Sequence, residues 1–235
     1  MTGVLIVGMH RSGTSMVTNM CHLLGVYVGE LEDLLPAHPV DQPNGYWEHA
    51  EGVAINTEIM NRMGSRSVYE AFPYQENWYR SRALDDLRPR AAKLLHRLAH
   101  RPVFGLKDPR LSLTLSFWAH EIMEMQQPVK VIWAWRHPTE VMKSLSRRGL
   151  GLNEALYRQI ADHHERIVRQ SLGFPLHIVN YEDCLQAPYT SAACLATFLR
   201  DSRQSIHGVQ IAAAAKVPQK GQKRSFITEE PYGSS

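Results

Sequence analysis

Arginine and hydroxyl side chains gather near the start of the chain, in a short loop that two glycines bound. An apolar run at residues 4–7 is followed by Gly8, and residues 9–15 then read Met-His-Arg-Ser-Gly-Thr-Ser. An aliphatic run, a glycine-bounded loop and helix-compatible residues predict a strand, a phosphate-binding loop and a helix. Glycines let successive backbone N–H groups turn inward, and the helix adds the positive end of its dipole. The loop is therefore a candidate anion site, with a tight turn into a core helix as the alternative.

The position of the positive charge separates this loop from a nucleoside triphosphate site. The Walker A pattern has Lys directly after its second glycine, followed by Ser or Thr. Here Thr14 stands at the lysine position, and Arg11 carries the cation three residues earlier. A triphosphate site needs that lysine at the helix start, beside a hydroxyl that holds Mg²⁺. Arg11, flanked by the hydroxyls of Ser12, Thr14 and Ser15, would instead lie against the outer end of a shorter anion.

A second arginine follows another predicted strand. Residues 129–135 read Val-Lys-Val-Ile-Trp-Ala-Trp, and this weak alternation is typical of a parallel strand covered on both faces. Arg136 comes next, Pro138 suits the first turn of a helix, and Ser144 lies about two turns along that helix. Ligands of open α/β sheets collect at the carboxyl ends of the strands. A guanidinium and a hydroxyl together suit a phosphate group, whereas the alternative is a strand-closing arginine and a solvent-facing serine.

These two motifs together resemble those of the sulfotransferases that use 3′-phosphoadenosine 5′-phosphosulfate (PAPS). The loop of that family reads Pro-Lys-Ser-Gly-Thr-Thr or Pro-Arg-Ser-Gly-Thr-Thr, and residues 10–15 match the Arg form except at the first and last positions. The Arg-x-Pro-x-x-Val-x-x-Ser frame is similar to the family's 3′-phosphate motif. The resemblance implies that PAPS is the co-substrate, and that the residues that bind it are His10, Arg11, Ser12, Gly13, Thr14, Ser15, Arg136 and Ser144.

Two further segments are similar to the same family. Residues 103–110 read Val-Phe-Gly-Leu-Lys-Asp-Pro-Arg, like the family strand whose terminal lysine reaches the transferred sulfate; Lys107 is the matching residue. The Lys-Asp-Pro-Arg form is associated with bacterial members. Residues 177–183 resemble the final strand and its Tyr-Glu-Asp turn, which implies that Tyr181 lies near the adenine. A Lys107–Asp108 ion pair and a half-buried core tyrosine are the structural alternatives.

The general base cannot be transferred from the cytosolic members of the family. Many of them use a histidine two positions after the strand lysine, and Pro109 occupies that position here. Carbohydrate and protein-tyrosine members use a glutamate, and residues 44–49, Asn-Gly-Tyr-Trp-Glu-His, resemble the Gly-Tyr-(Phe/Trp)-Glu segment of bacterial relatives. Glu48 is the first candidate for the base, His49 the second and Asp108 the third. For Glu48, a carboxylate that caps or orients the adjacent helix is the alternative.

Strand and helix signals alternate along the chain, which predicts one α/β domain over residues 1–235 with a doubly wound, mostly parallel sheet and helices on both faces. An acceptor-side insert is expected at about 30–100, and a mobile tail from about 201. The expected strands cover residues 4–7, 26–28, 103–107, 129–135 and 177–181, and the expected helices cover 14–24, 51–63, 84–98 with an interruption at Pro89, 113–125, 138–148 and 153–172.

Composition favours a soluble, cytoplasmic protein. The 235 residues are 44% hydrophobic, enough for a full core without disulfides or metal. The three cysteines, Cys21, Cys184 and Cys194, lack metal-ligand spacing and fit a reducing compartment. No run approaches the roughly eighteen apolar residues of a membrane span. We therefore expect no metal, no membrane span and no disulfide framework.

The distribution of charge and aromatic residues bears on the partners. A net charge of +3 is too small to indicate nucleic acid. Seven carboxylates and no Lys or Arg fall between residues 28 and 60, which fits an acidic acceptor region or a solvated helix face. A small-molecule, carbohydrate or lipid acceptor is expected. The aromatic side chains that could line its site, or simply pack in the insert, are Tyr46, Trp47, Tyr69, Phe72, Tyr74, Trp78 and Tyr79.

The resemblance implies sulfuryl transfer to a hydroxyl or amine, in line and without metal, with Arg11 and Lys107 neutralising charge on the leaving phosphate. In the basic tail, Arg224 lies where cytosolic members close a Lys-Gly loop over the cofactor, and it is a further candidate for cofactor binding. Two other functions stay open: a P-loop kinase or NTPase, which would turn over ATP with Mg²⁺, and a nucleotide-binding module without catalysis.

Overall fold

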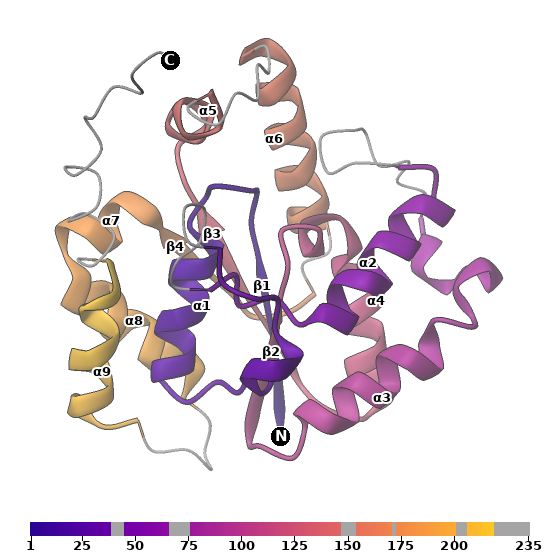
Figure 1. The fold of residues 1–235 in the computed structure, drawn as a ribbon, viewed down its shortest axis with the longest axis horizontal. Helices are drawn as coiled ribbons and strands as arrows, with labels where there is room; N and C mark the ends of the chain where they lie inside the picture. The colour runs from indigo at the N-terminus through magenta and orange to yellow at the C-terminus, as the bar shows by residue number, and fades with distance from the viewer. Residues whose placement is uncertain (39–44, 66–75, 147–153, 171–172, 201–205, 219–235) are drawn as a thin grey trace, which may run out of the picture.

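A four-stranded, all-parallel sheet forms the centre of the molecule (Figure 1). The computed structural model describes residues 1–38, 45–65, 76–146, 154–170, 173–200 and 206–218. The strands are β1 (Thr2–Val7), β2 (Val103–Lys107), β3 (Val129–Trp135) and β4 (Leu176–Asn180), in the order β2-β1-β3-β4. The predicted doubly wound α/β fold is confirmed.

Helices cover both faces of the sheet. Successive side chains of a strand therefore enter two different apolar cores, one on each face. All residues of β1 and β2 are buried. Along β1, Leu5 and Val7 join one apolar cluster, whereas Val4 and Ile6 join the other. Each fully buried aliphatic side chain contributes about 1.5–3 kcal/mol. The near-continuous apolar sequence of these strands therefore reflects burial on two sides, as parallel sheets require.

One face of the sheet is covered by helices from the two ends of the chain. α1 (Thr14–Leu23) follows the loop after β1, and its Val17 and Met20 pack against apolar residues of α8 (Pro188–Leu199) and α9 (Gly208–Ala215). Figure 1 shows α1, α8 and α9 on the left of the sheet. Helix α9 lies within the tail that the sequence predicts to be mobile, and its Ala214 and Ala215 are buried.

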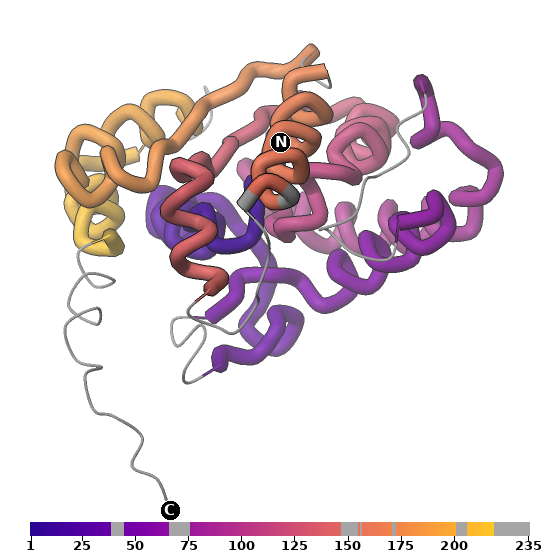
Figure 2. The backbone as a smooth tube through the Cα atoms, turned by 90° about the horizontal axis from the view of Figure 1, so that it is seen from above, coloured from indigo at the N-terminus to yellow at the C-terminus, as the bar shows by residue number. Residues whose placement is uncertain are grey.

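The opposite face carries the larger helical layer. Figure 2 shows these helices and those of the first layer on opposite sides of the sheet. The larger layer consists of α2 (Ala50–Arg62), α3 (Arg88–Leu98), α4 (Leu111–Glu124) and α6 (Glu154–Gln170). Pro89 starts α3 instead of interrupting it, because proline in the first turn loses no helical hydrogen bond. Short 3₁₀ turns at Trp78–Arg80 and Arg82–Leu84 precede α3, and another lies at Leu31–Asp33.

Two short helices stand at the carboxyl edge of the sheet. α5 (Pro138–Ser146) follows β3, and α7 (Tyr181–Gln186) follows β4 directly. The expected strand at 26–28 is reduced to a single bridge between Tyr27 and Phe104 at the β2 edge. The carboxyl ends of β1, β2 and β3 therefore bring Arg11, Lys107 and Arg136 to one end of the sheet.

The described part of the chain contains no helix long and apolar enough to cross a membrane. The three cysteines are free thiols; Cys21 and Cys184 are buried and Cys194 is exposed. Two of the acidic residues of the 28–60 segment, Glu51 and Glu58, pair with Arg90 of α3. For these two carboxylates, the observed pairing fits the interpretation of the acidic segment as a solvated helix face.

Candidate functional site

The loop after β1 is built around two glycines that no other residue could replace without strain. Gly8 has φ 148° and Gly13 has φ 94°. A Cβ atom on Gly8 would lie 2.4 Å from the Ala134 carbonyl oxygen, and one on Gly13 would lie 2.5 Å from Cδ2 of Tyr181. The loop is therefore pressed against the tip of β3 and against the first residue of α7. These close approaches need the missing side chain and the left-handed backbone together.

The positive end of α1 points out of this loop without a cap. Gly13 is the N-cap residue, and no described side chain makes an N-cap hydrogen bond to this helix. The initial N–H groups of a helix have no partner inside it and form an anion site. The Ser12 hydroxyl is turned inward and donates to the Met9 carbonyl at 2.7 Å, so it closes the loop. Thr14 is also buried.

The two predicted anion-binding arginines lie side by side. Arg136 Nη1 donates to the Arg11 carbonyl oxygen at 3.5 Å, and Arg11 Nε donates to Ser144 Oγ at 3.0 Å. The Arg136 guanidinium lies over the Tyr181 ring, 4.2 Å from its centre, and its Nε donates to Glu182 at 3.3 Å. The structure thus brings together the loop arginine, the strand-end arginine, the helical serine and the tyrosine in one group.

Lys107 ends β2 on the other side of the loop and is almost fully buried. Its ammonium donates to Ser15 Oγ at 3.2 Å, to the Tyr46 carbonyl at 2.9 Å and to Glu48 Oε1 at 2.6 Å. Ser15 also donates to the Tyr46 carbonyl at 3.1 Å. The ion pair of Lys107 is therefore with Glu48 and not with the adjacent Asp108. These bonds tie the loop, β2 and the segment before α2 together.

Asp108 belongs to a buried polar network that the sequence did not indicate. Its Oδ2 accepts from Asn56 Nδ2 at 2.9 Å, and its Oδ1 accepts from the backbone N–H and from Nη1 of Arg110, both at 2.9 Å. Asn56 Oδ1 in turn accepts from Thr114 and from Trp118 Nε1, both at 2.7 Å. Of the partners of Asp108, only Arg110 was named from the sequence, as part of the Lys-Asp-Pro-Arg segment. The partners come from α2 and α4, which are far apart in the sequence.

His49 has the capping role that the sequence suggested for Glu48. It is the N-cap of α2, and its Nδ1 accepts from the Glu51 backbone N–H at 3.2 Å. Its Nε2 lies 3.9 Å from Asp33. Burial lowers the pKa of His49. The ring is therefore a neutral cap next to the buried Glu48 carboxylate.

Electrostatics mark the loop interior as a place for an anion. Burial and the nearby charges of Arg110 and Lys107 lower the pKa of His10 to about 3. The imidazole is neutral at pH 7, first because burial deprives a charged ring of its hydration and second because protonation would add one more cation to a positive site. For Glu48, burial raises the pKa despite the attraction of Lys107.

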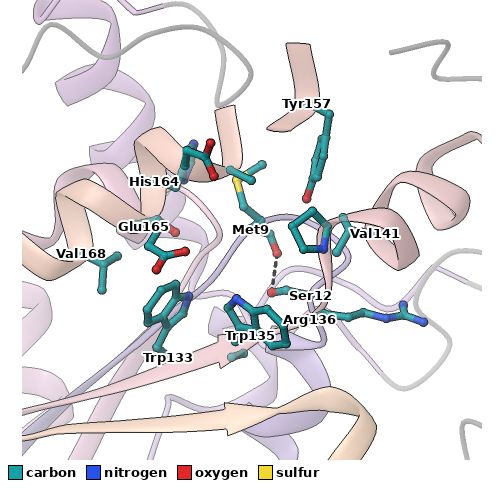
Figure 3. Close-up of a pocket in the computed structure, with 15 residues that line it drawn as sticks. Met9, Ser12, Trp133, Trp135, Arg136, Val141, Tyr157, His164, Glu165 and Val168 are labelled. Carbon is teal, nitrogen blue, oxygen red and sulfur yellow. Dashed lines mark hydrogen bonds between the residues drawn. The ribbon is translucent and has the colours of Figure 1, made fainter. Parts of the chain in front are cut away.

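A small pocket lies behind the loop, between the end of β3 and α6 (Figure 3). Trp133 and Trp135 of β3 face Tyr157 and His164 of α6 across it, and the Arg136 side chain points away from them. Its volume of about 40 Å³ holds little more than one water molecule. It is too small for a nucleotide.

Several predicted residues lie outside this arrangement. Trp78 is buried and Tyr79 packs against the same apolar core, while Trp47 packs beside α1. Packing accounts for these three. Arg224, Tyr69, Phe72 and Tyr74 fall outside the described residues. Among the described residues there is no group of three or more His, Cys, Asp or Glu side chains that could hold a metal ion.

The parallel sheet, the loop after β1 and the arginine after β3 define an α/β fold of the sulfotransferase type. One solved structure with this fold is the sulfotransferase STF9 from Mycobacterium avium, with a TM-score of 0.52 and 11% identity over 99% of this chain and 70% of that one. A retinol dehydratase in complex with androsterone and the inactive cofactor PAP has a TM-score of 0.40 and 16% identity, over 92% of this chain and 64% of that one. No protein-family model and no curated protein matches the sequence.

Proposed function

We propose that this protein is a PAPS-dependent sulfotransferase, which moves a sulfuryl group to a hydroxyl or amine of a small-molecule, carbohydrate or lipid acceptor without a metal ion. The observation that supports this most strongly is the contact of Arg136 with the Arg11 backbone. The donor is anionic at both ends, with a 3′-phosphate and a 5′-phosphosulfate. Two cationic pockets at the tips of neighbouring parallel strands suit such a molecule.

The residues of the first pocket fit the phosphosulfate end. The uncapped N-terminus of α1 offers backbone N–H groups, and Arg11 adds a side-chain cation. In this proposal His10, Ser12, Gly13, Thr14 and Ser15 shape the cradle. Gly13 lies close to the Tyr181 ring, so the first pocket adjoins the second one.

The second pocket fits the 3′-phosphate and the adenine. Arg136 donates to Glu182 through Nε only. A guanidinium has five N–H donors, so Arg136 can still donate to a phosphate group. Ser144 contributes a hydroxyl. The Arg136 guanidinium lies over the Tyr181 ring, and in this proposal the ring is next to the adenine. Arg224 stays a proposal from the sequence.

Glu48 is the proposed general base. Transfer removes a proton from the acceptor, forms the bond from the acceptor oxygen to sulfur, and breaks the bond from sulfur to the phosphate oxygen, which keeps the electron pair. Glu48 takes the proton, while Arg11 and Lys107 stabilise the charge on the leaving phosphate. His49 is engaged as a helix cap and both Asp108 oxygens are hydrogen-bonded, which favours Glu48 over these two candidates.

Calorimetry tests this function through the 3′-phosphate. We expect 3′-phosphoadenosine 5′-phosphate (PAP) to bind about tenfold to a hundredfold more tightly than adenosine 5′-phosphate, which is the effect of one or two charge-assisted hydrogen bonds. Arg136→Ala should abolish this difference. Lys143→Ala removes an exposed cation of α5 and should preserve it.

Two outcomes would contradict the proposed function. Equal affinity of the wild type for the two nucleotides would show that no 3′-phosphate site exists. Mg²⁺-dependent ATP turnover would instead support a kinase, because sulfuryl transfer requires no metal.

A further inference from the structure

The Lys107 ammonium has no hydrogen-bond donor left for a ligand. A lysine has three N–H donors, and those of Lys107 meet Ser15 Oγ, the Tyr46 carbonyl and Glu48 Oε1. The side chain is 1% exposed, so water does not supply an alternative arrangement. If Lys107 is to contact the sulfuryl group, it must give up one of these three partners.

The arginines of the site do not face this restriction. Arg110 contacts Asp108 through a single nitrogen, Nη1, and Arg136 contacts Glu182 through Nε. A guanidinium has five N–H donors, so it can hold a carboxylate and an anionic ligand together. An ammonium that already has three acceptors cannot do so. Lys107 is thus the cation whose ion pair the donor must disturb.

Glu48 is the partner that an anion would displace. The Ser15 hydroxyl and the Tyr46 carbonyl are neutral, whereas the Glu48 carboxylate carries the same charge as the sulfuryl group and repels it at short range. Burial strengthens that repulsion because little water screens it. The two neutral bonds can persist when the sulfuryl group replaces the carboxylate.

The segment that carries Glu48 is held in place independently of the ion pair. The Tyr46 carbonyl accepts from both Ser15 and Lys107. The backbone of Trp47 has φ 61°, a left-handed conformation that an aromatic residue keeps only when its surroundings enforce it. The Glu48 backbone carbonyl also accepts from the Leu35 N–H at 2.8 Å. Glu48 therefore stays beside the site after it loses Lys107.

We propose that Glu48 competes with the donor for Lys107: binding of the sulfuryl group moves the ammonium from Glu48 to the donor, and this exchange frees Glu48 to accept the acceptor's proton. The inference rests on the proposed function. It makes the base available only when a sulfuryl group is present, so donor binding precedes proton removal. The buried ammonium keeps one anionic partner before and after the exchange, and the buried Glu48 carboxylate, left without its cation, becomes a stronger proton acceptor.

Binding calorimetry with PAPS and PAP tests this competition, because only PAPS carries the sulfuryl group. Glu48→Gln keeps the shape of the side chain and removes its charge. We expect this variant to bind PAPS about tenfold more tightly than the wild type, with unchanged affinity for PAP. Glu51→Gln, at the start of α2 and paired with Arg90, is the matched control and should leave both affinities unchanged.

Circular dichroism shows whether Glu48→Gln folds. If the loss of charge impairs folding, a second variant that keeps the charge tests the same competition. Glu48→Asp preserves the charge but withdraws the carboxylate from Lys107, and it should raise PAPS affinity about threefold. An unchanged or weakened preference for PAPS over PAP in the folded variants would overturn the competition. A wild type that binds neither nucleotide would overturn the proposed function instead, so the two failures are distinct.

Discussion

At the scale of single residues, the Glu48–Lys107 ion pair is central to the proposed chemistry. The two side chains are 2.6 Å apart and 8% and 1% exposed. A buried charge is costly unless it is paired, so the loss of either partner would be destabilising. Burial still raises the pKa of Glu48. A carboxylate with a raised pKa binds a proton more strongly than an ordinary glutamate, which suits a general base.

This leads to a prediction about turnover and its pH dependence. Glu48→Gln should lower kcat about a hundredfold to ten-thousandfold, while Glu51→Gln stays near the wild type. In the wild type, Glu48 loses its basic, ionised form as the pH falls through its raised pKa. An ordinary glutamate has a pKa of about 4.3. Activity should therefore begin to decline at a higher pH than it would with an ordinary glutamate as the base. The measurement is PAP release with a panel of phenol and sugar acceptors. Near-normal turnover in Glu48→Gln would exclude this base.

At the scale of elements, a hydrogen-bonded chain joins β2, α2 and α4 behind the site. Asn56 of α2 stands at its centre and serves Asp108, Thr114 and Trp118 at once. Through Asp108 the chain also fixes Arg110 at the start of α4. Buried polar groups that lose their partner are destabilising. The network therefore fixes the positions of α2 and α4 relative to β2, the strand that ends at Lys107.

The network predicts a stability effect that is specific to one face of α2. Asn56→Ala leaves several buried polar groups without a partner and should lower the free energy of unfolding by about 2–4 kcal/mol. Asn61→Ala, on the exposed side of the same helix, should change it by less than about 0.5 kcal/mol. Urea denaturation measures both. Similar small losses in the two variants would mean that the network contributes little.

At the scale of the whole molecule, the strand order brings the two cationic loops together. β1 lies between β2 and β3, so the loop after β1 is flanked by Lys107 on one side and Arg136 on the other. Gly8 makes this close packing possible, since its N–H donates to Ser112 Oγ at 3.2 Å and its Cα faces the Ala134 carbonyl. The proposed donor site therefore depends on the whole sheet edge and not on any single loop.

A single methyl group should disrupt this edge. Gly8→Ala places a Cβ 2.4 Å from the Ala134 carbonyl oxygen, at φ 148°, and should abolish PAP binding and lower the melting temperature by several degrees. Gly173→Ala is the control, because no heavy atom lies within 4 Å of its added Cβ. Calorimetry and thermal unfolding give the readouts. Wild-type PAP affinity in Gly8→Ala would show that the loop does not need this packing.

Local spacing in the sequence was enough to determine the strand, loop and helix at residues 2–23, the strand before Arg136 and the parallel α/β class. Apolar periodicity and glycine position act over a few residues, so they can be read without the fold. The resemblance of the sequence motifs to those of sulfotransferases also predicted the sulfotransferase-type fold, which the comparison with solved structures confirms. The roles of the individual site residues stay predictions.

Only the tertiary structure decided which charges pair. The sequence left Lys107 with Asp108 as a neighbour and Glu48 as a possible helix cap; the fold gives Lys107 to Glu48 and the cap to His49. The Asn56 network was equally invisible. Ion pairs and buried hydrogen bonds join residues that the chain separates widely, and their partners are chosen by strand order and helix packing, which local patterns do not encode.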